Sequence, residues 1–232
     1  MTEREERFIV IPARGGSKRL PRKNVLPLAG KPLICWTIDA ALATGLAARI
    51  MVTSDDEEIL AIARRYTNNG LIVHKRPADL ASDHASTTDA LLDALNAEHQ
   101  AGHDPKTLIL LQPTSPLRTS EDILAAVRKY EESGSADTVV TVCEVDHPTA
   151  WIGTIGANGQ LQGLDLSGER SQGYQKEYRL NGAVYVACVK TLRQQGNLFT
   201  DNLRACVMPR ERSLDIDEKV DFSICDRLLQ RN

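Results

Sequence analysis

The sequence has little of what marks secreted, membrane or nucleic-acid-binding proteins. It contains five cysteines and no C-x-x-C pair, so it indicates neither a disulfide framework nor a zinc ribbon. No apolar run is long enough to cross a membrane, and the run after the charged N-terminus is too short for a signal peptide. The 28 basic side chains are outnumbered by 31 acidic ones, which disfavours nucleic acid or anionic lipid as a partner. We therefore expect a soluble, cytoplasmic protein with neither partner.

Short β-branched runs alternate with amphipathic helical patterns through the first 140 residues. The runs predict strands at 8–12, 50–54, 71–74, 107–112 and 138–143. The helical patterns lie at 59–66 and 123–130, preceded by capping signals at Ser54 and Thr119. This alternation predicts a Rossmann-like α/β fold, in which helices cover both faces of a mostly parallel sheet.

The regular alternation breaks in the segment after Cys143. Residues 153–182 hold seven glycines and show no helical period, which predicts turns and short strands. The regular pattern then resumes with strands and a closing helix, at 182–189, 204–208 and 220–228. We expect a single domain, 1–232, from which a Gly-rich β arm at 144–180 protrudes.

A cationic, glycine-containing loop follows the first expected strand. Gly15 and Gly16 free the backbone to approach phosphate oxygens, and five cations crowd the same stretch: Arg14, Lys18, Arg19, Arg22 and Lys23. Ligands of open α/β sheets bind at the carboxyl ends of strands, where this loop begins. The loop has neither the Walker A pattern nor the G-x-G-x-x-G fingerprint. A solvated basic loop is the alternative, but its position favours a binding site for a polyanion.

Two aspartates alternate with an apolar residue near the C-terminus. In an extended segment Asp215 and Asp217 share one face, and Ile216 points into the core. Two carboxylates on one face offer the hard oxygen ligands that Mg²⁺ takes together with substrate phosphates. Paired aspartates before a helix are alternatively caps.

Five motifs in a fixed order resemble the acylneuraminate cytidylyltransferases, which make CMP-activated sialic acids and related nonulosonic acids. The motifs are IPARGGSKRLPRKN, RPADLASDHAS, LLQPTSPLRT, YRLNGAVYV and SLDIDEKVD. The resemblance implies a nucleotidyltransferase in which the anomeric hydroxyl of the sugar attacks the α-phosphorus of CTP and pyrophosphate leaves. It also implies Mg²⁺ as cofactor, held by Asp215 and Asp217.

The resemblance also distributes roles over the motif residues. It assigns catalysis to Arg14, Lys23 and Asp217. It places CTP against Arg14, Ser17, Lys18, Lys23, Asn24, Arg76 and Thr87. For Arg76 a surface salt bridge, and for Thr87 a position at a helix start, are the structural alternatives.

The acceptor sugar would meet the remaining motif residues, namely Gln112, Arg170, Arg179, Asn181 and Tyr185. An arginine fork suits the carboxylate of an acidic nine-carbon sugar, whereas Tyr185 fits an ordinary core position equally well. The arm is implied to be exchanged in a homodimer, with Arg170 or Lys176 reaching the partner's site. SQGYQKEY is one residue longer than in similar sialic-acid members, and Ala150 stands where some have lysine, which favours a legionaminic- or pseudaminic-type sugar.

Two alternative functions stay open at this point. One is a related nucleotidyltransferase for another acidic sugar, such as Kdo, or for another nucleotide. The other is a non-catalytic nucleotide-binding module, which has less need for both the cationic loop and the aspartate pair.

Overall fold

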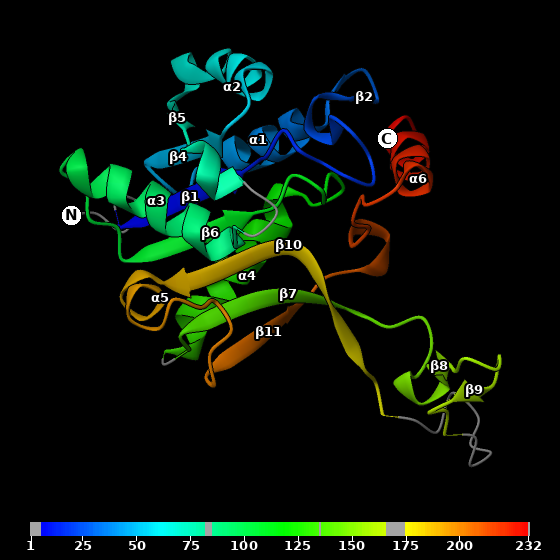
Figure 1. The fold of residues 1–232 in the computed structure, drawn as a ribbon. Coiled ribbons are helices and arrows are strands. Elements are labelled where there is room, and N and C mark those ends of the chain that lie inside the picture. Colours follow the sequence, from blue (N-terminus) through cyan, green and yellow to red (C-terminus); the bar gives the residue numbers. More distant parts are fainter. Residues whose placement is uncertain (1–5, 82–84, 135, 166–174, 232) are drawn as a thin grey trace.

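The computed structural model describes residues 6–81, 85–134, 136–165 and 175–231, and a seven-stranded sheet forms its centre (Figure 1). In spatial order the strands are β11 (Leu203–Val207), β7 (Thr138–Glu144), β10 (Tyr178–Cys188), β6 (Thr107–Leu111), β1 (Arg7–Pro12), β4 (Arg49–Ser54) and β5 (Leu71–Lys75). All neighbours pair in parallel, except that β10 runs antiparallel to β6 and β7. The predicted mostly parallel sheet is confirmed.

Helices cover both faces of this sheet. One face packs against α1 (Leu33–Thr44), α2 (Glu57–Arg64) and α4 (Ser120–Ser133), and the other against α3 (Thr87–Gln100) and α5 (Val189–Gln195). Along β1, Ile9 and Ile11 belong to the first core cluster and Phe8 and Val10 to the second. The two-residue period of a strand explains this division, and burial on both faces explains the nearly continuous apolar run.

A third apolar cluster supports the segment that carries the two aspartates. It joins the hairpin of β2 (Pro27–Leu28) and β3 (Lys31–Pro32) to the closing helix α6 (Lys219–Leu229). Ile216 and Cys225 are fully buried within it. The prediction that Ile216 points into the core is confirmed, and its burial fixes the backbone on both sides of it.

Three apolar residues spaced four apart in α6 do not face the core. Val220, Ile224 and Leu228 are exposed, whereas Cys225 is buried and Phe222 packs against the same cluster. The helix carries apolar residues on two faces, and the neighbouring hairpin covers only one of them.

The segment between β7 and β10 extends away from the sheet (Figure 1). Its described part contains a small hairpin of β8 (Thr154–Ile155) and β9 (Leu161–Gln162), in agreement with the predicted turns and short strands. β10 begins at Tyr178, so Arg179 and Asn181 lie inside the strand rather than before it. Residues 166–174, which include Arg170, lie outside the described residues.

The two predicted capping boxes have different outcomes. Thr119 and Asp122 form the expected box at the start of α4. The prediction for Ser54 is wrong: Asp56 is the N-cap of α2, and its carboxylate accepts the amides of Glu58 and Ile59. β4 continues through Ser54, which leaves Asp56 at the helix start. Within the described ranges, no helix combines the length and apolar character needed to span a bilayer.

Candidate active site

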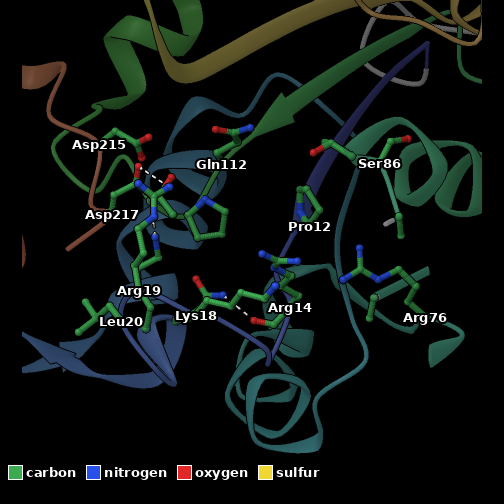
Figure 2. A pocket seen from close by; sticks show the side chains of 18 of the residues that line it. Pro12, Arg14, Lys18, Arg19, Leu20, Arg76, Ser86, Gln112, Asp215 and Asp217 are labelled. Carbon is green, nitrogen blue, oxygen red and sulfur yellow. Dashed lines mark hydrogen bonds and ion pairs between the residues drawn. The ribbon is translucent and has the colours of Figure 1, made fainter. Parts of the chain in front are cut away.

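A pocket of about 690 Å³ lies at the carboxyl ends of β1, β5 and β6 (Figure 2). Its lining comes from four stretches of chain: the loop after β1, the segment from Arg76 to Thr87, the turn after β6, and the aspartate pair. Asp215 and Asp217 lie on one side of the pocket, beside Arg19, and Arg76 lies on the opposite side. The topology therefore brings four of the five sequence motifs to one place.

The loop after β1 supplies most of the positive charge. Arg14, Lys18 and Arg19 are exposed side chains that line the pocket together with Ser17. Asn24 is buried, and its Nδ2 donates to the carbonyl oxygen of Arg14 at 3.1 Å, which fixes the path of the loop. The predicted triphosphate-binding residues of this loop thus share one wall.

Lys23 is a buried cation at the floor of the pocket. Its Nζ donates to the carbonyl oxygen of Ile216 and lies 3.6 Å from Oδ1 of Asp217. Burial lowers the pKa of Lys23, while the carboxylates of Asp217 and Asp215 oppose that shift. Asp217 also pairs with Arg19 at 3.0 Å. Two cations from the first motif therefore contact the aspartate of the last one.

The aspartate pair offers carboxylate oxygens to the pocket. Oδ1 of Asp215 is buried and accepts no hydrogen bond from the described residues, and burial raises the pKa of this carboxyl group. Asp217 is less buried, with its side chain 42% exposed. The described residues contain no cluster of three or more His, Cys, Asp or Glu with metal-site geometry. A divalent ion would take two protein carboxylates here and complete its shell from phosphate and water, as Mg²⁺ does.

Arg76 and Thr87 line the other end of the pocket. Arg76 is 6% exposed, and burial lowers the pKa of its guanidinium group. Its Nη2 lies 3.7 Å from Oδ1 of Asp55, and its Nε is buried without a partner among the described residues. Thr87 is the first residue of α3, after the N-cap Ser86, so the helix-start alternative also describes it correctly.

Gln112 follows β6 and reaches the pocket next to a strand irregularity. In β10 the ladder with β7 shifts between Leu180 and Tyr185, and Gly182 adopts a positive φ of 73° there. A Cβ atom on Gly182 would lie 2.7 Å from Oε1 of Gln112. Bulges of this kind re-aim side chains near functional sites.

Arg118 holds the turn after β6 against this bulge. The side chain is buried and donates to the carbonyl oxygens of Gln112 at 3.1 Å and Ala183 at 3.0 Å, and to Thr37 Oγ1 at 2.6 Å. Burial lowers the pKa of Arg118 to about 9. The arginine of the third motif thus supports the backbone beneath Gln112.

Three predicted acceptor residues do not line the pocket. Arg179 is exposed, and Tyr185 is buried in the core cluster that contains α3 and α5. Asn181 is buried: its Oδ1 accepts from Thr141 Oγ1 at 2.7 Å and its Nδ2 donates to Ser213 Oγ at 2.9 Å. Asn181 therefore links the bulge to the segment that leads to Asp215.

Several pocket residues were not among the predicted site residues. Arg19, Leu20, Pro113 and Thr114 line the pocket beside predicted neighbours in the first and third motifs. Arg19 belongs to the cation cluster already visible in the sequence. Asp55 and Asp56, which support the pocket from behind, carry no sequence signal beyond a capping pattern.

Comparison with known proteins agrees with this geometry. Residues 8–228 match the family described as Cytidylyltransferase. The chain belongs to this family. The N-acylneuraminate cytidylyltransferase of Escherichia coli O18:K1:H7 is 35% identical over 96% of this chain and 52% of its own length. The CMP-N,N'-diacetyllegionaminic acid synthase of Legionella pneumophila is 34% identical, over 96% of both chains.

A solved structure shares the fold of this chain. The structure of CMP:2-keto-3-deoxy-manno-octonic acid synthetase complexed with CTP has a TM-score of 0.72 and covers 97% of this chain and 99% of that chain. At 18% identity, this likeness shows the fold alone. The chain spans about half the length of the Escherichia coli relative and nearly all of the Legionella one. The resemblance drawn from the five motifs is confirmed as family membership.

Proposed function

We propose that the protein is a cytidylyltransferase that joins CTP to a nonulosonic acid and releases pyrophosphate. The observation that carries the proposal is the meeting of the cationic loop, Gln112 and the aspartate pair in one pocket. Family membership supports CTP as the nucleotide, and the names of the Escherichia coli and Legionella relatives support a nonulosonic acid as the acceptor.

The cations of the loop have a direct role in this reaction. Negative charge accumulates on the α-phosphate and on the leaving pyrophosphate as the anomeric oxygen attacks. Arg14 and Lys18 line the pocket where the triphosphate would lie, and Lys23 adds a fixed charge at its floor. Preorganised charges in a partly buried site stabilise such a transition state more than water does.

Asp215 and Asp217 would hold the Mg²⁺ ion that the fold family implies. The unpartnered Oδ1 of Asp215 supports this assignment. When bound, Mg²⁺ would neutralise phosphate charge and orient the nucleotide. Arg19 and Lys23 already compensate the charge of Asp217, which keeps the pair arranged before substrate binds.

The acceptor would lie between Gln112 and the aspartate pair. Gln112 is half-buried and offers both a donor and an acceptor for sugar hydroxyl groups. Arg179, Asn181 and Tyr185 do not line the pocket, so Gln112 is the one predicted acceptor residue, among those that the structure describes, that does. Arg170 lies outside the described residues, and Lys176 pairs with Glu144 at 2.9 Å. We propose that one of these two residues meets the acceptor through the arm of a partner subunit.

The arm offers an apolar surface for such a homodimer. Ile155 is 76% exposed, Ile152 63% and Leu161 56%, and these residues lie on or beside the β8–β9 hairpin. Exposed apolar side chains gathered on one projecting element are typical of interaction sites. Sedimentation that finds only monomer at working concentrations would contradict the dimer.

The need for CTP supports a cytoplasmic location.

The decisive experiment measures pyrophosphate release from CTP and Mg²⁺ with a panel of neuraminic, legionaminic, pseudaminic and Kdo acids, with mass detection of the product. We expect a CMP-sugar peak with one of the nine-carbon acids, and its loss in Asp217→Asn. Asp201→Asn, an exposed turn position, serves as the matched control.

Each other outcome has a definite meaning. If Kdo alone gave a product, the acceptor would be that eight-carbon sugar and not a nonulosonic acid. Tight CTP binding in calorimetry, with no product from any acceptor, would favour a nucleotide-binding module. Turnover of another nucleotide in preference to CTP would contradict the assignment of the base.

A further inference from the structure

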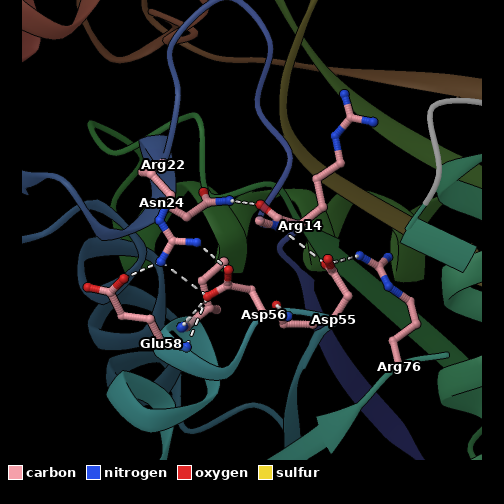
Figure 3. A network of polar contacts seen from close by, with 10 residues as sticks. Arg14, Arg22, Asn24, Asp55, Asp56, Glu58 and Arg76 are labelled. Atoms are coloured by element: carbon pink, nitrogen blue, oxygen red, sulfur yellow. Dashed lines mark hydrogen bonds and ion pairs between the residues drawn. The ribbon is translucent and has the colours of Figure 1, made fainter. Parts of the chain in front are cut away.

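Two consecutive aspartates, Asp55 and Asp56, follow β4 and contact Gly15 and Arg22 after β1 (Figure 3). Asp56 caps α2 and pairs with Arg22, which also pairs with Glu58. Asp55 has no part in the cap. Its Oδ1 accepts the backbone N–H of Gly15 at 3.2 Å, and the same oxygen lies 3.7 Å from Nη2 of Arg76.

The sheet order explains why Asp55 reaches two motifs at once. β4 lies between β1 and β5, and it pairs in parallel with both. The cationic loop, which we also call the phosphate loop, follows β1, and Arg76 follows β5. A side chain at the end of the middle strand is therefore placed to contact the residues that follow its two neighbours.

Asp55 also compensates the positive charge of Arg76, and the carboxylate of Asp93 acts on it in the same sense. Arg76 is 6% exposed and feels the positive charge of Arg14, so its cation is disfavoured before an anion arrives. Asp55 acts in the opposite sense on Arg76, and its side chain is 25% exposed. Asp55 is not among the described residues that line the pocket. It therefore acts through its two partners, Gly15 and Arg76.

We propose that Asp55 is a positioning residue that fixes the phosphate loop and Arg76 relative to each other, and so couples recognition of the triphosphate to recognition of the base. This inference rests on the proposed function, because it takes CTP as the ligand that spans both ends of the pocket. One carboxylate oxygen serves both contacts, so a change at Asp55 alters both ends of the site together.

The first test needs no nucleotide. Amide hydrogen exchange at Gly15 is compared in the wild type, in Asp55→Asn, and in Asp104→Asn, an exposed carboxylate that pairs with His99 away from the pocket. We expect faster exchange at Gly15 in Asp55→Asn alone, because the amide loses its charged acceptor. Unchanged exchange in that variant would overturn the anchoring of the loop by Asp55.

The second test is a double-mutant cycle of Asp55→Asn and Arg76→Gln, measured on KM and kcat with CTP. We expect Asp55→Asn to raise the KM for CTP about tenfold with a much smaller change in kcat. In the Arg76→Gln background, Asp55→Asn should raise the KM for CTP at most about threefold, because the two residues act as a unit. Strictly multiplicative effects, or an unchanged KM, would overturn the coupling.

The design separates this inference from the proposed function. A wild type that turns over no CTP contradicts the proposed function, while exchange at Gly15 still tests the contact with Asp55. Should Asp55→Asn fail to fold, Asp55→Ser replaces it in both tests with the same expectations, because the serine hydroxyl carries no charge. Melting temperatures of all variants confirm that folded proteins are compared.

Discussion

Oε1 of Gln112 occupies the space that a Cβ atom on Gly182 would need, since that atom would lie 2.7 Å away. The backbone of Gly182 has a φ of 73°. This conformation is unfavourable for residues other than glycine. The bulge in β10 thus brings bare backbone against a side chain that lines the pocket. Both space and conformation require glycine at this position.

Gly182→Ala is expected to displace Gln112 and weaken acceptor binding. We predict a rise of about tenfold in the KM for the sugar, with the KM for CTP little changed. Gly196→Ala is the matched control, because Gly196 has a φ of 63° but no atom within 4 Å of the added Cβ. Steady-state kinetics with each substrate varied in turn measure the effect. Equal kinetics in the two variants would show that backbone strain, rather than Gln112, matters.

Gly15→Ala should weaken CTP binding through the phosphate loop. The added Cβ would lie 2.6 Å from Oδ2 and 2.9 Å from Cβ of Asp56, so the loop or the start of α2 must move. We predict a loss of about tenfold to a hundredfold in affinity for CTP, measured by calorimetry. Gly16→Ala meets no atom within 4 Å and should lose much less. A greater loss in Gly16→Ala than in Gly15→Ala would contradict the prediction.

Lys23→Met should reduce the chemical step more than it reduces binding. Removal of a buried cation that faces the developing phosphate charge is expected to lower kcat about a hundredfold to a thousandfold. Lys129→Met, an exposed position on α4, provides the control for loss of a lysine charge. Single-turnover measurements with saturating CTP separate the two effects. A change in the KM for CTP alone would assign Lys23 to ground-state binding.

Asp122→Ala is expected to destabilise the fold without changing the residues that line the pocket. The carboxylate caps α4 and accepts two hydrogen bonds from Arg212, both at 2.9 Å. Loss of the cap and of a partly buried ion pair should cost about 2 to 4 kcal/mol of unfolding free energy. Denaturant unfolding against Glu132→Ala, an exposed position on the same helix, measures this cost.

The pH dependence of that difference follows from the pKa of Asp122. Burial raises this pKa, but the hydrogen bonds and charge of Arg212 and the Thr119 amide outweigh burial and leave it below its ordinary value. The stabilisation is therefore complete above the ordinary pKa of aspartate and is lost as the pH falls through the lowered value. Wild type and Asp122→Ala should converge in stability in strong acid. A constant difference down to pH 2 would contradict this assignment.

The sequence predicts the central parallel strands well because β1, β4 and β6 are buried on both faces. The runs that contain Ile9, Ile50 and Ile109 are largely apolar, and that pattern is typical of a covered sheet. The alternation of Asp215, Ile216 and Asp217 likewise depends on the two-residue period alone. Local patterns suffice wherever burial follows a single period.

The remaining features depend on contacts distant in sequence. Asn181 turns inward because the bulge in β10 interrupts the strand period, and Thr141 of β7 holds it there. In α6, Val220 and Phe222 are both apolar, and only the position of the β2–β3 hairpin decides which of them packs. The link from Asp55 to Arg76 requires the strand order, which no local pattern contains.

The arm leaves the sheet from β7 and returns through β10, the strand paired beside it. The ends of the insertion are therefore held together by the ladder itself, and its length and sequence can change at little cost in loop entropy. Successive mutations can therefore change this segment while the protein still folds at each step. Changes in the arm can therefore accumulate independently of changes in the pocket.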